Sequence, residues 1–198
     1  MPATEDQKAA GRAAIDEFLK EVEQILTLYY DGWRAFGLLA AEYEQTAQKI
    51  KDSTRISDEE LAKLIHKYVY QLASDLPEHE VAERTHHEYW EDNQHNGRNL
   101  RRLGNLCLVQ IYALWERECR PTIKVHLGVL PNSDVMGDVR LLRISILHHH
   151  GVATDDVARC TELTWFKPGD PILITFDQFR LFWQAIREDM ARLRATIA

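Results

Sequence analysis

The sequence predicts an all-α fold: a single helical domain over residues 1–198, with long N-terminal helices and one minor β-hairpin near the C-terminus. Apolar residues recur at alternating steps of three and four over most of the chain, which indicates helices. Strand-like sequence is confined to Leu163–Thr175. We divide the domain into a helical scaffold (1–76), a polar arm or insertion (77–97) and a core that holds the motifs (98–198).

The stretch from Gln7 to Lys51 predicts one long helix. Its apolar positions form a narrow seam, typical of a helix packed against nearly parallel or antiparallel partners. The seam consists of Ile15, Leu19, Val22, Leu26, Tyr29, Trp33, Phe36, Ala40 and Tyr43. It serves either as a scaffold or as an oligomer surface.

Two further segments complete the N-terminal half. Ser57 and Glu60 have the spacing of a capping box, which predicts a helix over 58–74. Residues 77–97 are polar and hold His79, His86, His87 and His95. A metal site is one alternative there, but the segment lacks HExxH and contains no cysteine. We therefore expect no metal, and a short helix or mobile arm that ends at Asn96-Gly97.

The helix predicted over 99–125 is the expected centre of the bundle. Leu106–Trp115 is apolar on nearly every side, as in a helix surrounded by others. Gln110 and Glu116 interrupt the apolar pattern and need polar partners if they are buried. Pro121 falls late in the pattern, where it kinks or ends the helix.

The last third of the chain predicts two helices with a non-helical segment between them. The first is capped by Ser133 or Asp134 and ends near Gly151, a favourable C-terminal cap. Leu163–Thr175 then forms a small hairpin or two extended segments around a turn. The closing amphipathic helix spans Phe176–Ile197.

Charge is distributed unevenly along the chain. The formal net charge of -7 argues against a protein that coats nucleic acid non-specifically. Residues 1–96 have a balance of -10, whereas residues 97–145 have a balance of +4. A locally basic middle can hold a phosphate in an acidic chain. The alternative is a solvated helix face.

The chain has three cysteines, Cys107, Cys119 and Cys160, with no CxxC pair. This sparse, odd set favours unpaired thiols in a reducing compartment. No apolar run approaches the ~18 residues of a membrane span, and the N-terminal residues have no secretion-signal pattern. We therefore expect a cytoplasmic protein with no membrane contact.

The stretch from Asp138 to Val152 combines a helical apolar run with a permanent cation and three consecutive histidines. Arg143 supplies a planar fork of donors matched to phosphate, and His148 follows after four intervening residues. Imidazole gives and takes protons near neutral pH. Together they suit phosphodiester cleavage. The alternative is a helix C-terminus at which His interacts favourably with the helix dipole.

Over residues 98–195 the sequence resembles the HEPN superfamily, all-α domains of prokaryotic toxin and defence systems, many of them metal-independent RNases. The resemblance lies in Ile-Tyr-Ala-Leu-Trp-Glu, then Arg-x4-His followed by Gly, then Trp-Phe-Lys-Pro-Gly-Asp-Pro-Ile. Arg143 and His148 match the four-residue form of the Arg-x4-6-His signature, while His149 and His150 fit the longer forms. The family often has a polar residue directly after the Arg, where this chain has Ile144.

The resemblance implies an endoribonuclease without cofactors, whose site is built where two protomers face each other. A dimer would also allow Arg143 and His148 to face the same site. On one ideal helix these two residues lie about 140° apart, whereas His150 is nearly on the Arg143 face. Either the helix ends before His148 and the chain turns back, or the pairing is made across the dimer. The supporting candidates are Glu116, Ser145, His149, His150 and Arg140.

Three hypotheses follow. The first is a homodimeric RNase acting as a toxin or phage-defence effector, with RNA as substrate and an antitoxin protein as partner. The second is a catalytically silent HEPN module that binds nucleotide or RNA or dimerises, which Ile144 and the acidic charge allow. The third is a metal-binding helical bundle that uses His148, His149, His150 and the His86-His87 pair.

Overall fold

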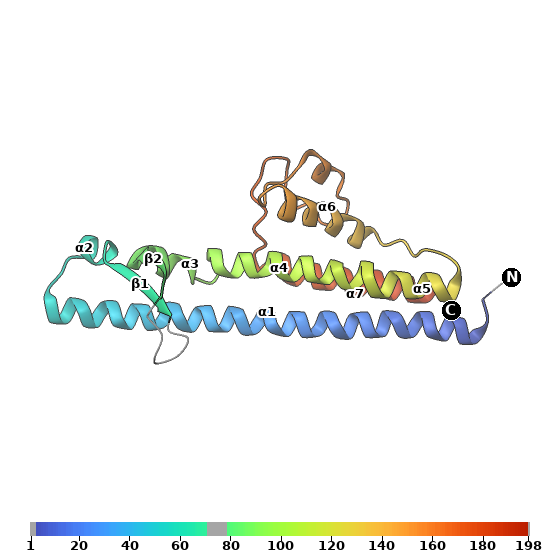
Figure 1. Cartoon of the computed structure of the whole chain (residues 1–198), viewed down its shortest axis with the longest axis horizontal. Coiled ribbons are helices and arrows are strands. Elements are labelled where there is room, and N and C mark those ends of the chain that lie inside the picture. Colours follow the sequence, from blue (N-terminus) through green and yellow to red (C-terminus); the bar gives the residue numbers. More distant parts are fainter. Residues whose placement is uncertain (1–2, 71–78, 198) are drawn as a thin grey trace. The chain divides into compact units, whose positions relative to one another are not determined.

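The computed structural model describes residues 3–70 and 79–197 and is mostly helical (Figure 1). The predicted all-α fold class is confirmed. The elements are α1 (Glu5–Thr54), α2 (Asp58–Ala62), β1 (Ile65–Tyr70), β2 (His79–Thr85), α3 (His86–Asp92), α4 (Arg98–Leu114), a π-helical turn (Trp115–Cys119), α5 (Arg120–Leu127), α6 (Asp134–His148), a short 3-10 helix (Asp155–Arg159) and α7 (Phe176–Thr196).

The chain divides into two compact units. The first unit combines Met1–Asp31 with Arg101–Ala198, and the second unit is Gly32–Leu100. Both boundaries fall inside helices, α1 and α4, so the units do not follow the three segments expected from the sequence. The assignment of one domain over the whole chain stays a prediction.

In the first unit, the N-terminal part of α1 packs along α5 and α7 (Figure 1). The seam residues Ile15, Val22 and Tyr29 are buried there. Tyr29 stacks on Phe179 with ring centroids 3.9 Å apart. Removing this apolar surface from water stabilises the unit. This part of the seam therefore serves as an internal scaffold, one of the two roles expected of it.

The helix expected over 99–125 is observed as α4, the π-helical turn and α5 in succession. The π turn ends two residues before Pro121, which has no N–H to donate to the carbonyl four residues back. The burial expected for Leu106–Trp115 is correct for one face only. Leu108 and Ile111 are buried, but Leu106 is 64% exposed, because this helix is covered on one side rather than surrounded.

Helix α6 begins as expected, with the Ser133 hydroxyl accepting a hydrogen bond from the Met136 amide. The segment after α6 is held by two polar side chains. The buried Asp138 carboxylate accepts from the amides of Thr161, Glu162 and Leu163 at 2.7–2.9 Å.

Asn105 is the second of these side chains. It donates to the Ile172 carbonyl at 2.6 Å and accepts from the Ile174 amide at 3.3 Å. Of the two forms expected for Leu163–Thr175, the hairpin is wrong and the extended segments around a turn are confirmed. The segment is extended around a turn, with one isolated bridge between Val152 and Pro171. Its backbone groups bond in part to the Asp138 and Asn105 side chains and in part to the backbone of Gly151 and Ala153.

The hairpin occurs in the second unit, where β1 pairs with β2 in antiparallel fashion and Ile65 lies opposite Thr85. The helix expected over 58–74 was therefore wrong beyond Ala62, although its Ser57–Glu60 capping box is present. Residues 65–70 include β-branched and aromatic types, which favour a strand. The last part of the expected helix (71–74) and of the expected scaffold (71–76) lies outside the described residues.

Residues 77–97, expected to be a short helix or mobile arm, contain β2 and then α3. Helix α3 begins with a second capping box, formed by Thr85 and Glu88. It ends at Gly97 as predicted. A Cβ atom at Gly97 would lie 2.5 Å from the carbonyl oxygens of Glu91 and Asp92, so the turn requires glycine there.

The three cysteines of the chain are free and buried, as expected of unpaired thiols. Burial raises the pKa of Cys107 to about 11 and the pKa of Cys119 and Cys160 to about 12. These thiols are accordingly part of the apolar core rather than a reactive site.

We predict that Asp138→Ala lowers the free energy of unfolding by about 3 kcal/mol, because three backbone amides lose a buried, charged acceptor. The exposed pair of Asp156 and Arg159 provides a matched control. Asp156→Ala should change stability by no more than about 0.5 kcal/mol. Urea unfolding followed by circular dichroism measures both. Equal stability of the two variants would contradict the role given to Asp138.

Candidate functional site

Helix α6 carries Arg143 half-buried near its middle and His148 exposed at its last position. The helix is unbroken between them, so in one chain the two side chains leave the axis about 140° apart. The alternative in which the helix ends before His148 and the chain turns back is therefore wrong. One chain therefore does not present Arg143 and His148 on the same face of α6.

The backbone leaves the helix directly after His148. His149 is the C-terminal cap, and His150 and Gly151 have positive φ values of 55° and 76°. The Gly151 amide still donates to the Ser145 carbonyl at 3.1 Å, which closes the helix end. His150 is thus not on the helix, and its expected alignment with the Arg143 face does not occur. His149 and His150 are both exposed.

Arg143 is positioned by an aromatic ring from α4. Its guanidinium carbon lies 5.2 Å from the centre of the Tyr112 ring, a cation–π arrangement. The Tyr112 hydroxyl donates to Glu116 at 3.2 Å, and Arg120 pairs with the same carboxylate at 3.2 Å. Glu116 thus contacts the ring that lies under Arg143, and its own side chain is exposed; its supporting role stays a prediction.

A cavity of about 390 Å³ opens beside this cluster, between the π turn with its flanking helices and the start of α6. Its lining residues are Tyr112, Trp115, Glu116, Arg120, Pro131, Asn132, Ser133, Met136, Gly137 and Arg140. Arg140, another supporting candidate, is exposed and lies one helical turn before Arg143. The guanidiniums of Arg120, Arg140 and Arg143 outnumber the carboxylate of Glu116, so the site suits an anion such as a phosphate.

The electrostatics of Tyr112 connect these groups. Burial raises the pKa of the Tyr112 phenol, and the neighbouring Glu116 carboxylate raises it further. The Arg140 and Arg143 guanidiniums act in the opposite direction. The phenol therefore stays a hydrogen-bond donor to Glu116 at neutral pH, and it does not compete with a bound anion as a phenolate would.

Ser145 lies outside this cluster. It is fully buried, and its hydroxyl bonds to the Leu141 carbonyl and accepts from the Thr154 amide. It therefore fastens the loop after α6 to the helix. Ile144, directly after Arg143, is half-buried.

Among residues 3–70 and 79–197, no group of three or more His, Cys, Asp or Glu side chains is arranged to hold a metal ion. His86 is buried with its ring 5.0 Å from that of Tyr43, and His87 lies 3.2 Å from Glu91. Over the same described residues, no helix has both the length and the apolar character required to cross a membrane.

Tyr112 and Arg120 belong to this cluster but are not among the site residues predicted from the sequence. Both lie four residues from Glu116, one before it and one after it. That spacing places neighbours on one helix face and was the available signal. It was obscured because the apolar run around Tyr112 indicates a core position.

In comparisons with known proteins, no family model, no curated protein and no solved structure matches the chain.

We predict that Gly137→Leu blocks anion binding without removing a charge. A Cβ atom at Gly137 would meet nothing within 4 Å, and Gly137 lines the cavity, so we expect a leucine side chain there to occupy part of it. Titration calorimetry with inorganic pyrophosphate should show affinity reduced about tenfold or more. Gly137→Ala is the control and should bind within about twofold of the parent protein.

Both Gly137 variants should be slightly more stable than the parent, since glycine weakens a helix by about 1 kcal/mol. Unchanged pyrophosphate affinity in Gly137→Leu would show that the anion does not bind in this cavity.

Proposed function

We propose that this chain is a metal-independent endoribonuclease that works as a homodimer, the function implied by its resemblance to the HEPN superfamily. Arg143 of one protomer pairs with His148 of the other to form each active site. The observation that carries the proposal is the placement of an exposed histidine at the end of the same unbroken helix that holds Arg143 above Tyr112.

The charge around Arg143 supports a nucleic-acid substrate. Arg120, Arg140 and Arg143 gather beside a cavity large enough for a phosphate group and part of its nucleotide. Phosphate contacts from guanidiniums fix the position of a nucleic-acid backbone. The cluster is small, and the acidic remainder of the chain disfavours binding to every polyanion.

The chemistry requires no cofactor. An imidazole, His148 in this proposal, takes the proton of a ribose 2′-hydroxyl, whose oxygen attacks the adjacent phosphorus. The bond from phosphorus to the 5′-oxygen breaks as an acid protonates that oxygen. Arg143 stabilises the negative charge that develops on the non-bridging oxygens. The products are a 2′,3′-cyclic phosphate and a 5′-hydroxyl.

The end of α6 also supports a dimer. Leu147 and Val152, on either side of the three histidines, are 48% and 44% exposed. Burial of these exposed apolar side chains against a second copy of the chain would be favourable. An interface with two-fold symmetry brings the same helix end of each protomer together. This surface would place His148 of one protomer near Arg143 of the other.

The remaining elements of the proposal follow from the resemblance. Such enzymes act as toxins or phage-defence effectors, and an antitoxin protein neutralises them. Expression of the active chain should therefore arrest bacterial growth, and the same expression of Arg143→Ala should not.

We predict cleavage of RNA in EDTA, with cyclic phosphate at the end of the 5′ fragment and no cleavage of DNA, which lacks the 2′-hydroxyl. Arg143→Ala and His148→Ala should each abolish cleavage while the helical signal is retained. Arg143→Lys should also fail, because an ammonium cannot reproduce the planar fork. His149→Ala and His150→Ala should retain most activity. Gel analysis of several RNA types measures all five variants.

The silent RNA-binding module is the second candidate, favoured by Ile144 after Arg143 and by the buried position of Ser145. No cleavage of any RNA, together with binding lost in Arg143→Ala, would establish it in place of the enzyme. Loss of activity or helical structure on chelation would instead favour the metal-binding bundle.

We predict that Leu147→Asp converts the dimer to a monomer and removes RNase activity, since a charge would be desolvated at the interface. Leu181→Asp is a matched control on α7, where Leu181 is similarly exposed. Analytical sedimentation at tens of micromolar protein measures the oligomeric state. A parent protein that sediments only as a monomer would contradict the shared site.

A further inference from the structure

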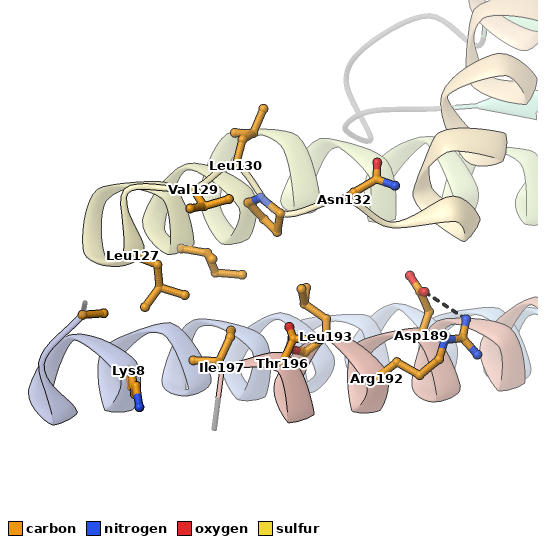
Figure 2. A pocket seen from close by; sticks show the side chains of 13 residues that line it. Lys8, Leu127, Val129, Leu130, Asn132, Asp189, Arg192, Leu193, Thr196 and Ile197 are labelled. Atoms are coloured by element: carbon orange, nitrogen blue, oxygen red, sulfur yellow. Dashed lines mark hydrogen bonds and ion pairs between the residues drawn. The ribbon is translucent and has the colours of Figure 1, made fainter. Parts of the chain in front are cut away.

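A second cavity, of about 630 Å³, lies at the end of the first unit between α5 with its following loop and helices α1 and α7 (Figure 2). Its size falls within the range of small-molecule sites. It shares Pro131 and Asn132 with the cavity beside Arg140, but its other lining residues are different and play no part in the proposed catalysis.

One end of this cavity is apolar. Figure 2 shows Leu127 directed from α5 toward α1, and Leu193 of α7 and Ile197, the residue after α7, directed into the same space. Val129 adds to this wall from the loop. Water in contact with these side chains is released when an apolar molecule replaces it, which favours binding.

The other end is polar, and among the described residues that line it every charged side chain is paired. The Asp189 carboxylate accepts from the Ser133 hydroxyl and from the Arg192 guanidinium, the latter at 3.0 Å. Lys8, at the edge of the cavity, pairs with Glu5 at 3.1 Å. A charged ligand group would lose water and find every opposite charge already engaged. A neutral group that forms hydrogen bonds has no such penalty.

We propose that this cavity binds a neutral, unbranched amphiphile with a hydroxyl or amide head. The head lies at Asn132 and Asp189, and the apolar chain extends toward Ile197. Helix α7 rises by about 12 Å between Asp189 and Ile197, which sets the length of chain that the cavity accepts. This proposal goes beyond the ribonuclease proposal and does not depend on it.

The test uses Nile red, a neutral dye that fluoresces in apolar sites, and its displacement by linear alcohols. Affinity should rise by about fourfold for each added methylene through hexanol, octanol and decanol, as burial of that group predicts. Octanoate and octylammonium have nearly the same chain as octanol and carry opposite charges. Each should displace the dye at least about tenfold less well than octanol.

Two exposed valines provide matched variants. Val129 lines the cavity and is 69% exposed, whereas Val125 on α5 is 78% exposed and does not line it. Val129→Glu should reduce the affinity for Nile red and octanol about tenfold or more, because the ligand would face a carboxylate. Val125→Glu should leave both affinities unchanged, and both variants should retain the helical signal.

Three results would overturn the proposal. One is an equal effect of the two glutamate variants, which would place the dye elsewhere. Another is displacement by octanoate or octylammonium as effective as that by octanol, which would remove the argument for a neutral head. The third is an affinity independent of alcohol length, which would exclude burial of the chain.

Discussion

The buried carboxylate of Asp138 determines how the C-terminal part of the first unit is built. It accepts three successive amides from the segment after the 3-10 helix and so fixes that segment to α6. Asn105 does the same from α4 for Ile172 and Ile174. Together with the backbone bonds to Gly151 and Ala153, these side chains hold the segment in place. They hold α6 in a defined position against α4, and with it Arg143 above Tyr112.

The position of α6 has a consequence for catalysis. Because the helix continues through His148, one chain presents Arg143 and His148 on different faces. The Arg143 guanidinium is directed toward the Tyr112 ring of α4, and the His148 imidazole lies at the exposed helix end beside Leu147 and Val152. The shared site that we propose between two protomers accommodates both placements.

Much of the fold was predictable because it rests on local patterns. The spacing of the apolar seam predicts the long α1, and the capping residues Ser57 and Ser133 mark helix starts where the sequence indicates them. What failed depends on contacts distant in sequence. Leu163–Thr175 has strand-like composition, but Asp138 and Asn105 take its backbone groups. The Tyr112–Glu116–Arg120 face was missed for a related reason, since the tyrosine belongs both to the core and to the site.

The central claim is that Arg143 from one protomer works with His148 from the other. The most direct measurement mixes the inactive variants Arg143→Ala and His148→Ala, allows subunits to exchange, and assays RNA cleavage in EDTA. A mixed dimer contains one site with both native residues and one site with neither. Random exchange should therefore restore about a quarter of the parent activity. A mixture as inactive as either variant alone, in dimers shown to have exchanged, would contradict the shared site.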